Sequence, residues 1–303
     1  MTEARKKLIE EKALSLLLSQ RISGEFALSF LDLRRITTGG AAVIDTFSSY
    51  EKKTTSSLPT EAEGITVKLS GMSLILYDDR ITNAGRRNWT IAHELGHAYH
   101  GLMIQDHRPL NTGYTMPVAE TASNFNELII VNDAIAKSEG EEKIQLIESQ
   151  LQDCTQIIVD IYSRFLFEDE VIRRRKNTFL FAKDLEEIMI NAQKEAYGDG
   201  LDPETLHPYM WCCKSHYFSA GLSYYNFPYA FGGLFARGLY ARYEQEGADF
   251  LPKYKKLLYT TTIASAEDTA RVAGIDLTDK EFWRSALQVI ADQIDLFCQL
   301  VEE

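Results

Sequence analysis

The stretch His93-Glu94-Leu95-Gly96-His97 constrains this chain more than any other part of its sequence. On an α-helix, residues four apart lie on one face a turn apart, so both imidazoles can reach one metal ion. Thr90 or Asn88 is an expected start for this helix. Its buried side would consist of Trp89, Ile91, Ala92, Leu95, Ala98, Tyr99 and Leu102. Two histidines at this spacing are typical of a zinc site.

Glu94 follows the first histidine and is turned about 100° from it around the helix. It can therefore reach a water molecule beside the metal without binding the metal itself. Zinc lowers the pKa of such a water to about 7 and polarises a peptide carbonyl. The pattern predicts Glu94 as the general base, which takes the proton of the water and passes it to the leaving amine. The alternative is a buried helix whose two histidines form hydrogen bonds only.

A catalytic zinc ion needs a third protein ligand and an open fourth position. Residues 117–131 predict a second helix, on which Glu120 and Glu127 lie seven apart and share a face. We expect Glu120 as the ligand, because the chain between it and His97 allows a helix end, a loop and a return. Glu127 either supports a ligand or is a solvated charge, and the solvated charge is favoured. His100 is the rival ligand, but three ligands from one helix would be strained.

Further motifs extend the pattern to the C-terminal half. They are His93–His100, Glu120–Ser123, Ser215–Phe218 and Tyr224–Gly232. Through these motifs, residues 93–303 resemble the oligoendopeptidase F branch of the thimet-oligopeptidase-like metallopeptidases. This resemblance implies one zinc ion per chain.

The resemblance also implies a role for each site residue. His93, His97 and Glu120 would bind the zinc ion, and Glu94 would be the base.

A later group of aromatic residues would act on the substrate. The resemblance implies that His216 and Tyr225 donate hydrogen bonds in the transition state and that Tyr229 contacts the substrate. Neutral donors beside a metal would stabilise an anionic tetrahedral intermediate. The family places its tyrosines at slightly different spacings, so which tyrosine has which role is open. For most aromatic residues in 207–243, packing in a core is the favoured interpretation.

The N-terminal part resembles a different family. Residues 1–97 are similar to ImmA/IrrE-type metallopeptidases, on the stretches 64–69, 74–78 and 86–93. The chain would then be a composite joined near the zinc helix, whether a natural fusion, a chimera or a design.

The expected fold is mainly α, a zincin-like helical catalytic domain with a small antiparallel β-sheet on the N-terminal side of the zinc helix. We expect two domains, residues 1–92 and 93–303. Residues 65–69 and 73–77 predict a hairpin, whose second strand would form the floor of the substrate cleft. Residues 51–63 predict a loop. Helices are expected at 3–20, 24–36, 141–176, 178–196, 203–219, 228–246, 250–263, 265–273 and 279–302.

Charge and composition exclude some partners. The net charge of −12 disfavours nucleic acid and anionic membranes as partners. The chain shows no signal peptide and no apolar run that could span a membrane, and its four cysteines form no CxxC pair. We therefore expect a cytoplasmic protein, whose oligomeric state the sequence leaves open.

The expected activity is that of a zinc metalloendopeptidase acting on short, unstructured oligopeptides. The sequence leaves two alternatives to this activity open. One is an ImmA/IrrE-like regulatory protease that acts on a repressor protein. The other is an inactive composite that binds zinc or peptides without turnover.

Overall fold

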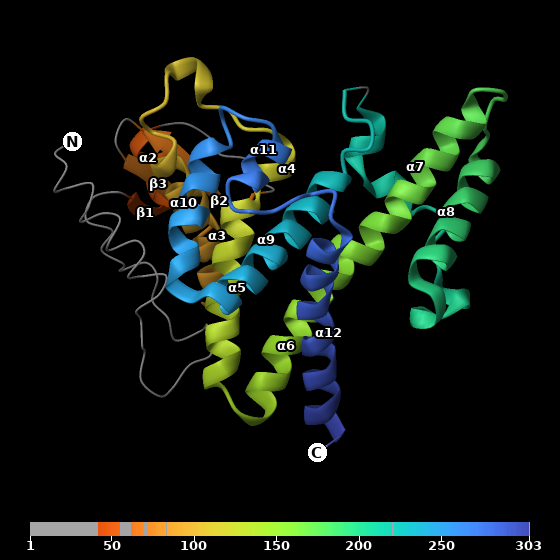
Figure 1. Ribbon diagram of the computed structural model, residues 1–303. Coiled ribbons are helices and arrows are strands. Elements are labelled where there is room, and N and C mark those ends of the chain that lie inside the picture. The colour runs from red at the N-terminus through yellow and green to blue at the C-terminus, as the bar shows by residue number, and fades with distance from the viewer. Residues whose placement is uncertain (1–41, 55–61, 70–71, 83, 220, 303) are drawn as a thin grey trace, which may run out of the picture. The chain divides into compact units, whose positions relative to one another are not determined.

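The computed structural model describes residues 42–54, 62–69, 72–82, 84–219 and 221–302 (Figure 1). The strands are β1 (Ala42–Thr46), β2 (Gly64–Leu69) and β3 (Met72–Tyr77). The helices are α2 (Phe47–Thr54), α3 (Ala84–Met103), α4 (Met116–Ala119), α5 (Thr121–Lys137), α6 (Gly140–Thr155), α7 (Ile161–Arg175), α8 (Ala182–Tyr197), α9 (Phe227–Glu246), α10 (Leu251–Thr260), α11 (Ala266–Arg271) and α12 (Lys280–Glu302). The expected mainly α fold with a small sheet is confirmed. The helices expected at 3–20 and 24–36 lie outside the described residues.

The described residues group into two compact units, one up to residue 147 and from 234 onward, the other from 148 to 233. The domain boundary expected between residues 92 and 93 falls inside α3 and stays a prediction. Residues 51–54 of the expected loop belong to α2 instead. In the part of the chain that the structure describes, no helix has both the length and the apolar character needed to cross a bilayer.

The sheet lies in the first unit and has the order β1-β3-β2. The expected hairpin is confirmed, because β2 and β3 pair antiparallel with Thr66 opposite Ile75. The sheet as a whole is mixed, since β1 pairs with β3 in parallel. Because β3 has a partner on both sides, it has no free edge to which a substrate strand could be added. The expectation that residues 73–77 form the floor of the cleft stays a prediction. Among the described strands, β2 is the edge next to the catalytic motif.

Helix α3 packs on β2 and β3. Tyr77 of the sheet forms a buried cluster with Ile91 and Ala92 of the helix. The helix begins at Ala84, so the start expected at Asn88 or Thr90 is wrong. The Thr90 hydroxyl donates to the backbone carbonyl of Arg86 at 3.0 Å, which is a bond made inside a helix.

Helix α5 lies directly against α3, and Gly96 makes this close approach possible. A Cβ atom at Gly96 would lie 2.5 Å from Cα of Ser123 and 2.6 Å from the carbonyl oxygen of Ala122. The Asn126 amide also donates to the carbonyl of Ala92 at 2.6 Å. The helix expected over 117–131 is interrupted at Glu120, which separates α4 from α5.

The second unit contains the α7–α8 hairpin, whose buried residues are Phe167, Ile188, Met189 and Ala192. The helix expected at 203–219 is wrong, because this segment consists of short 3-10 turns. Pro208 lies in its interior and has no N–H group to continue a helix. The helix expected over 141–176 is interrupted by a π-helical turn at 156–160.

Candidate metal centre

Three side chains of the first unit place their metal-binding atoms close together. His93 and His97 come from α3, and Glu120 lies at the junction of α4 and α5. The two Nε2 atoms are 3.1 Å apart, and each lies 3.4 Å from Oε2 of Glu120. In the described residues these three form a group whose ligand atoms all lie within 4.8 Å of one another.

The size of this triangle fits a zinc ion. A tetrahedral zinc ion with bonds of about 2.0–2.1 Å holds its ligand atoms roughly 3.3 Å apart. The observed separations of 3.1, 3.4 and 3.4 Å are close to that value. The side chains of His93 and Glu120 are each 29% exposed, so the group is open toward solvent on one side. A catalytic metal needs an open fourth position of this kind.

Glu127 fixes the orientation of the first histidine. Its Oε1 atom lies 2.8 Å from Nδ1 of His93. A proton on Nδ1 shared with this carboxylate leaves the Nε2 lone pair directed at the metal position. The interpretation of Glu127 as a solvated charge, which the sequence favoured, is therefore wrong.

The acidic surroundings also change the charge of His93. Burial disfavours its charged form, but the hydrogen bond to Glu127 and the charges of Glu127, Glu120 and Glu94 outweigh this effect. Together they raise the pKa of His93 to about 9. In the metal-free protein, a metal ion must therefore displace a proton from this imidazole near neutral pH.

Glu120 is held as a carboxylate. The Ser123 hydroxyl donates to its Oε2 atom at 2.7 Å, the same atom that faces the histidines. Burial disfavours the charged form, but the hydrogen bond and charge of His97, with the charge of His93, lower the pKa of Glu120 to about 2. The side chain of Glu120 is thus negatively charged near neutral pH.

Glu94 contacts the edge strand β2. The Thr66 hydroxyl lies 2.6 Å from Oε2 of Glu94 and 3.0 Å from its backbone oxygen. The shorter contact identifies the carboxylate as the main acceptor. Gly64 leaves the space for this arrangement, since a Cβ atom there would lie 2.8 Å from Cγ of Glu94. Glu94 itself is buried.

His100 takes no part in this group. It is fully buried, its Nε2 atom lies 2.7 Å from the Thr261 hydroxyl, and its ring stacks on Tyr114. The rival interpretation of His100 as the third ligand is therefore wrong.

The structure brings the three remaining predicted site residues together in the second unit. The ring centroids of His216 and Tyr225 are 4.6 Å apart, and that of Tyr229 is 6.3 Å from His216 and 5.8 Å from Tyr225. They form a separate aromatic group, and their roles stay predictions.

Sequence reasoning missed the residues that support the site. Thr66 gave no signal, because its contact depends on where strand β2 lies relative to α3. Ser123 belongs to a motif that the sequence analysis noted, and its position three residues after Glu120 is within reach of that side chain. Asn126 could have been suspected only as a polar residue on the apolar side of a helix.

Comparison with known proteins places this geometry in a family. Residues 87–289 match the model of peptidase family M3. The oligopeptidase PepF of Bacillus subtilis is 24% identical over 68% of this chain and 31% of its own length. An oligoendopeptidase F homolog of Borreliella burgdorferi is 26% identical over 72% of this chain and 36% of its own length. The chain thus spans about a third of the length of these curated relatives.

Two solved structures share the fold. A candidate peptidase from Chlamydophila abortus matches 98% of this chain and 47% of its own, with a TM-score of 0.74 and 20% identity. The oligoendopeptidase-F of Enterococcus faecium matches 72% of this chain and 40% of its own, with a TM-score of 0.61 and 18% identity. The ImmA/IrrE-type resemblance of residues 1–97 has no support in these matches. The composite origin stays a prediction.

Proposed function

The chain belongs to peptidase family M3, and from this premise we propose that it is a zinc-dependent endopeptidase that hydrolyses short, unstructured peptides. The observation that carries this proposal is the triangle of His93, His97 and Glu120, with a size that suits zinc and an open side. The histidines and the carboxylate match the donor set of catalytic zinc sites in peptidases. Family membership supports the metallopeptidase class.

Five residues form and support the proposed metal site. His93, His97 and Glu120 hold the metal, and Glu127 and Ser123 orient two of these ligands. A zinc ion bound there supplies an acidified water molecule and a polarised carbonyl group.

Glu94 would act as the general base, taking a proton from the attacking water and delivering it to the leaving amine. Thr66 donates to one carboxylate oxygen of Glu94, which supports a fixed orientation of the proposed base. For His216, Tyr225 and Tyr229, the proposed roles as donors to the transition state and as a substrate contact rest on the sequence motif alone.

The first test compares the wild-type chain with Glu94→Gln on a short quenched fluorescent peptide, with bound zinc quantified on the same samples. The variant keeps the shape of the side chain and removes its basic oxygen. We expect equal zinc in both and a loss of at least about a hundredfold in hydrolysis for the variant. Equal hydrolysis by both would refute Glu94 as the base. Zinc without any hydrolysis by the wild type would favour a protein that binds metal without turnover.

A further inference from the structure

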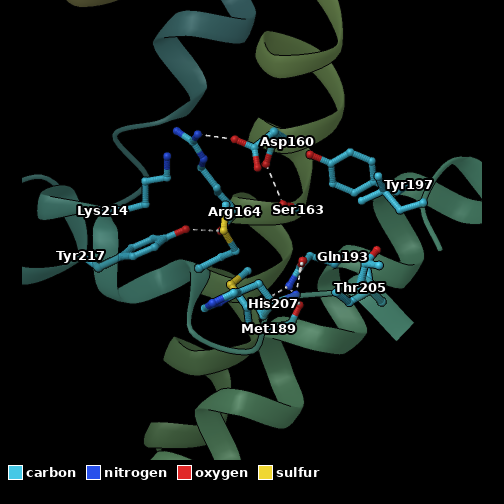
Figure 2. Close-up of a pocket in the computed structure, with 13 residues that line it drawn as sticks. Asp160, Ser163, Arg164, Met189, Gln193, Tyr197, Thr205, His207, Lys214 and Tyr217 are labelled. Carbon is cyan, nitrogen blue, oxygen red and sulfur yellow. Dashed lines mark hydrogen bonds and ion pairs between the residues drawn. The ribbon is translucent and has the colours of Figure 1, made fainter. Parts of the chain in front are cut away.

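The second unit contains a pocket that none of the roles described above uses. It lies between helices α7 and α8 and the connection that follows α8, and its volume is about 210 Å³ (Figure 2). Thr205 and His207 on the connection are exposed, so the pocket opens to solvent there.

The lining of the pocket differs between its two ends. Figure 2 shows Asp160, Arg164 and Lys214 gathered at one end, and Met189 and His207 at the other. Apolar side chains complete the lining, among them Leu206 and Met210. Methionine side chains adapt to ligands of different shape.

The charged end has an excess of positive charge. Arg164 is 8% exposed, forms an ion pair with Asp160 and donates to the Asn226 side chain at 3.2 Å. Asp160 is therefore already paired with one cation. Lys214 takes part in no ion pair within the described part of the chain, although its amine lies at the same end as the Arg164 guanidinium.

Two cations beside one carboxylate favour an anion as a further partner. Among the residues that the structure describes, the buried Nε atom of Arg164 has no hydrogen-bond partner, which is unusual for a buried donor. A cationic ligand would meet the repulsion of Lys214 and find Asp160 occupied. A small inorganic anion would leave the apolar end of the pocket unfilled.

From these observations we infer that the pocket binds a small carboxylate with an apolar side chain, such as an apolar amino acid or the last residue of a short peptide. The carboxylate contacts Lys214 and Arg164, and the side chain lies against Met189, Leu206 and Met210. Such a ligand would contact α7, α8 and the connection that carries Lys214 at the same time.

Calorimetry with the full chain tests this binding site. The probe is N-acetyl-leucine, compared with N-acetyl-leucinamide, which lacks the carboxylate, and with leucinamide, which carries an ammonium group instead. Inorganic phosphate is the fourth probe. We expect saturable binding of N-acetyl-leucine and at least tenfold weaker binding of the other three. Equal or tighter binding of an amide or of phosphate would overturn the ligand class, and no saturable binding of any probe would overturn the site.

Two lysine variants test whether N-acetyl-leucine binds in this pocket. Lys214→Gln should weaken the binding of N-acetyl-leucine at least tenfold. The control is Lys183→Gln, which removes an exposed lysine of α8 outside the pocket and should leave the affinity unchanged. Thermal unfolding of both variants checks that they fold. A second readout is hydrogen exchange of residues 203–217, which the ligand should slow in the wild type only. Binding that survives Lys214→Gln and disappears when the metal is removed would place the carboxylate at the metal centre and refute the inference.

Discussion

At the scale of single residues, the contact between Thr66 and Glu94 explains how the side chain of the proposed base keeps one orientation. A hydroxyl 2.6 Å from one carboxylate oxygen restricts the rotation of the side chain. Thr66→Val has nearly the same shape and lacks the donor. We expect about a tenfold lower kcat with KM and bound zinc little changed, since a hydrogen bond to a charged group is worth about 1.5–3 kcal/mol.

Thr66→Ser is the matched control for this prediction, because it keeps the hydroxyl group. It should restore most of the activity that Thr66→Val loses. Equal losses in both variants would show that the hydroxyl group does not account for the loss and would contradict the proposed role of this hydrogen bond.

Glu127 gives a prediction about pH. In the metal-free protein the pKa of His93 rises from its ordinary 6.5 to about 9 beside Glu127. A raised pKa in the folded state adds stability that is complete below pH 6.5 and is lost as the pH rises through 9. Glu127→Gln should therefore lower the free energy of unfolding of the metal-free protein more at pH 6 than above pH 9.

Chemical unfolding of chelator-treated wild type and Glu127→Gln across this pH range measures the difference directly. A gap between the two proteins that stays constant with pH would contradict the proposed ion pair. The same variant should bind zinc about 10 to 100-fold more weakly, because partners of ligating histidines contribute about that much to affinity.

The sequence revealed the site residues unequally. His93, Glu94 and His97 could be found because a helix converts spacing along the chain into a shared face. Glu120 followed because a third ligand was needed, although the break between α4 and α5 at this residue was not predicted. Thr66 could not be found, because nothing local to residues 64–69 indicates which helix the strand will meet.

At the scale of elements, the close packing of α3 on α5 positions the third ligand. Gly96 allows this contact, and an alanine there would place its Cβ atom 2.5 Å from the backbone of Ser123. Gly96→Ala must therefore push α5 away and move Glu120 from the histidines. We expect weaker zinc binding and a loss of about 1–3 kcal/mol in the free energy of unfolding.

Gly113→Ala is the control, because a Cβ atom at Gly113 would meet no atom within 4 Å. It should change neither zinc affinity nor stability by a measurable amount. Normal zinc affinity in Gly96→Ala would contradict the view that the spacing of the two helices sets the metal site.

The sequence predicted the helices better than it predicted the pairing of the strands. Most helices showed a clear apolar period, and their bounds agreed within a few residues. The segment 203–219 is rich in aromatic residues and resembled a helix, yet Pro208 and short turns dominate it. The parallel pairing of β1 with β3 joins segments about thirty residues apart, and no local pattern encodes such a contact.

At the scale of the whole molecule, the metal centre is assembled entirely within one compact unit. The sheet, α3 and α5 all belong to the residues up to 147, and the aromatic group of His216 belongs to the other unit. Metal binding and the integrity of the second unit are therefore separable in experiment. The family match begins at residue 87, so strand β2 and Thr66 are features of this chain outside the matched segment.

The most direct test of the central claim is a zinc titration of the chelator-treated chain, with peptide hydrolysis measured at each step. The stripped protein should be inactive, and its activity should rise in proportion to added zinc and level off at one zinc ion per chain. His97→Ala should bind zinc too weakly to follow this curve. Hydrolysis that persists in the stripped protein, or none at one bound zinc ion per chain, would contradict the account.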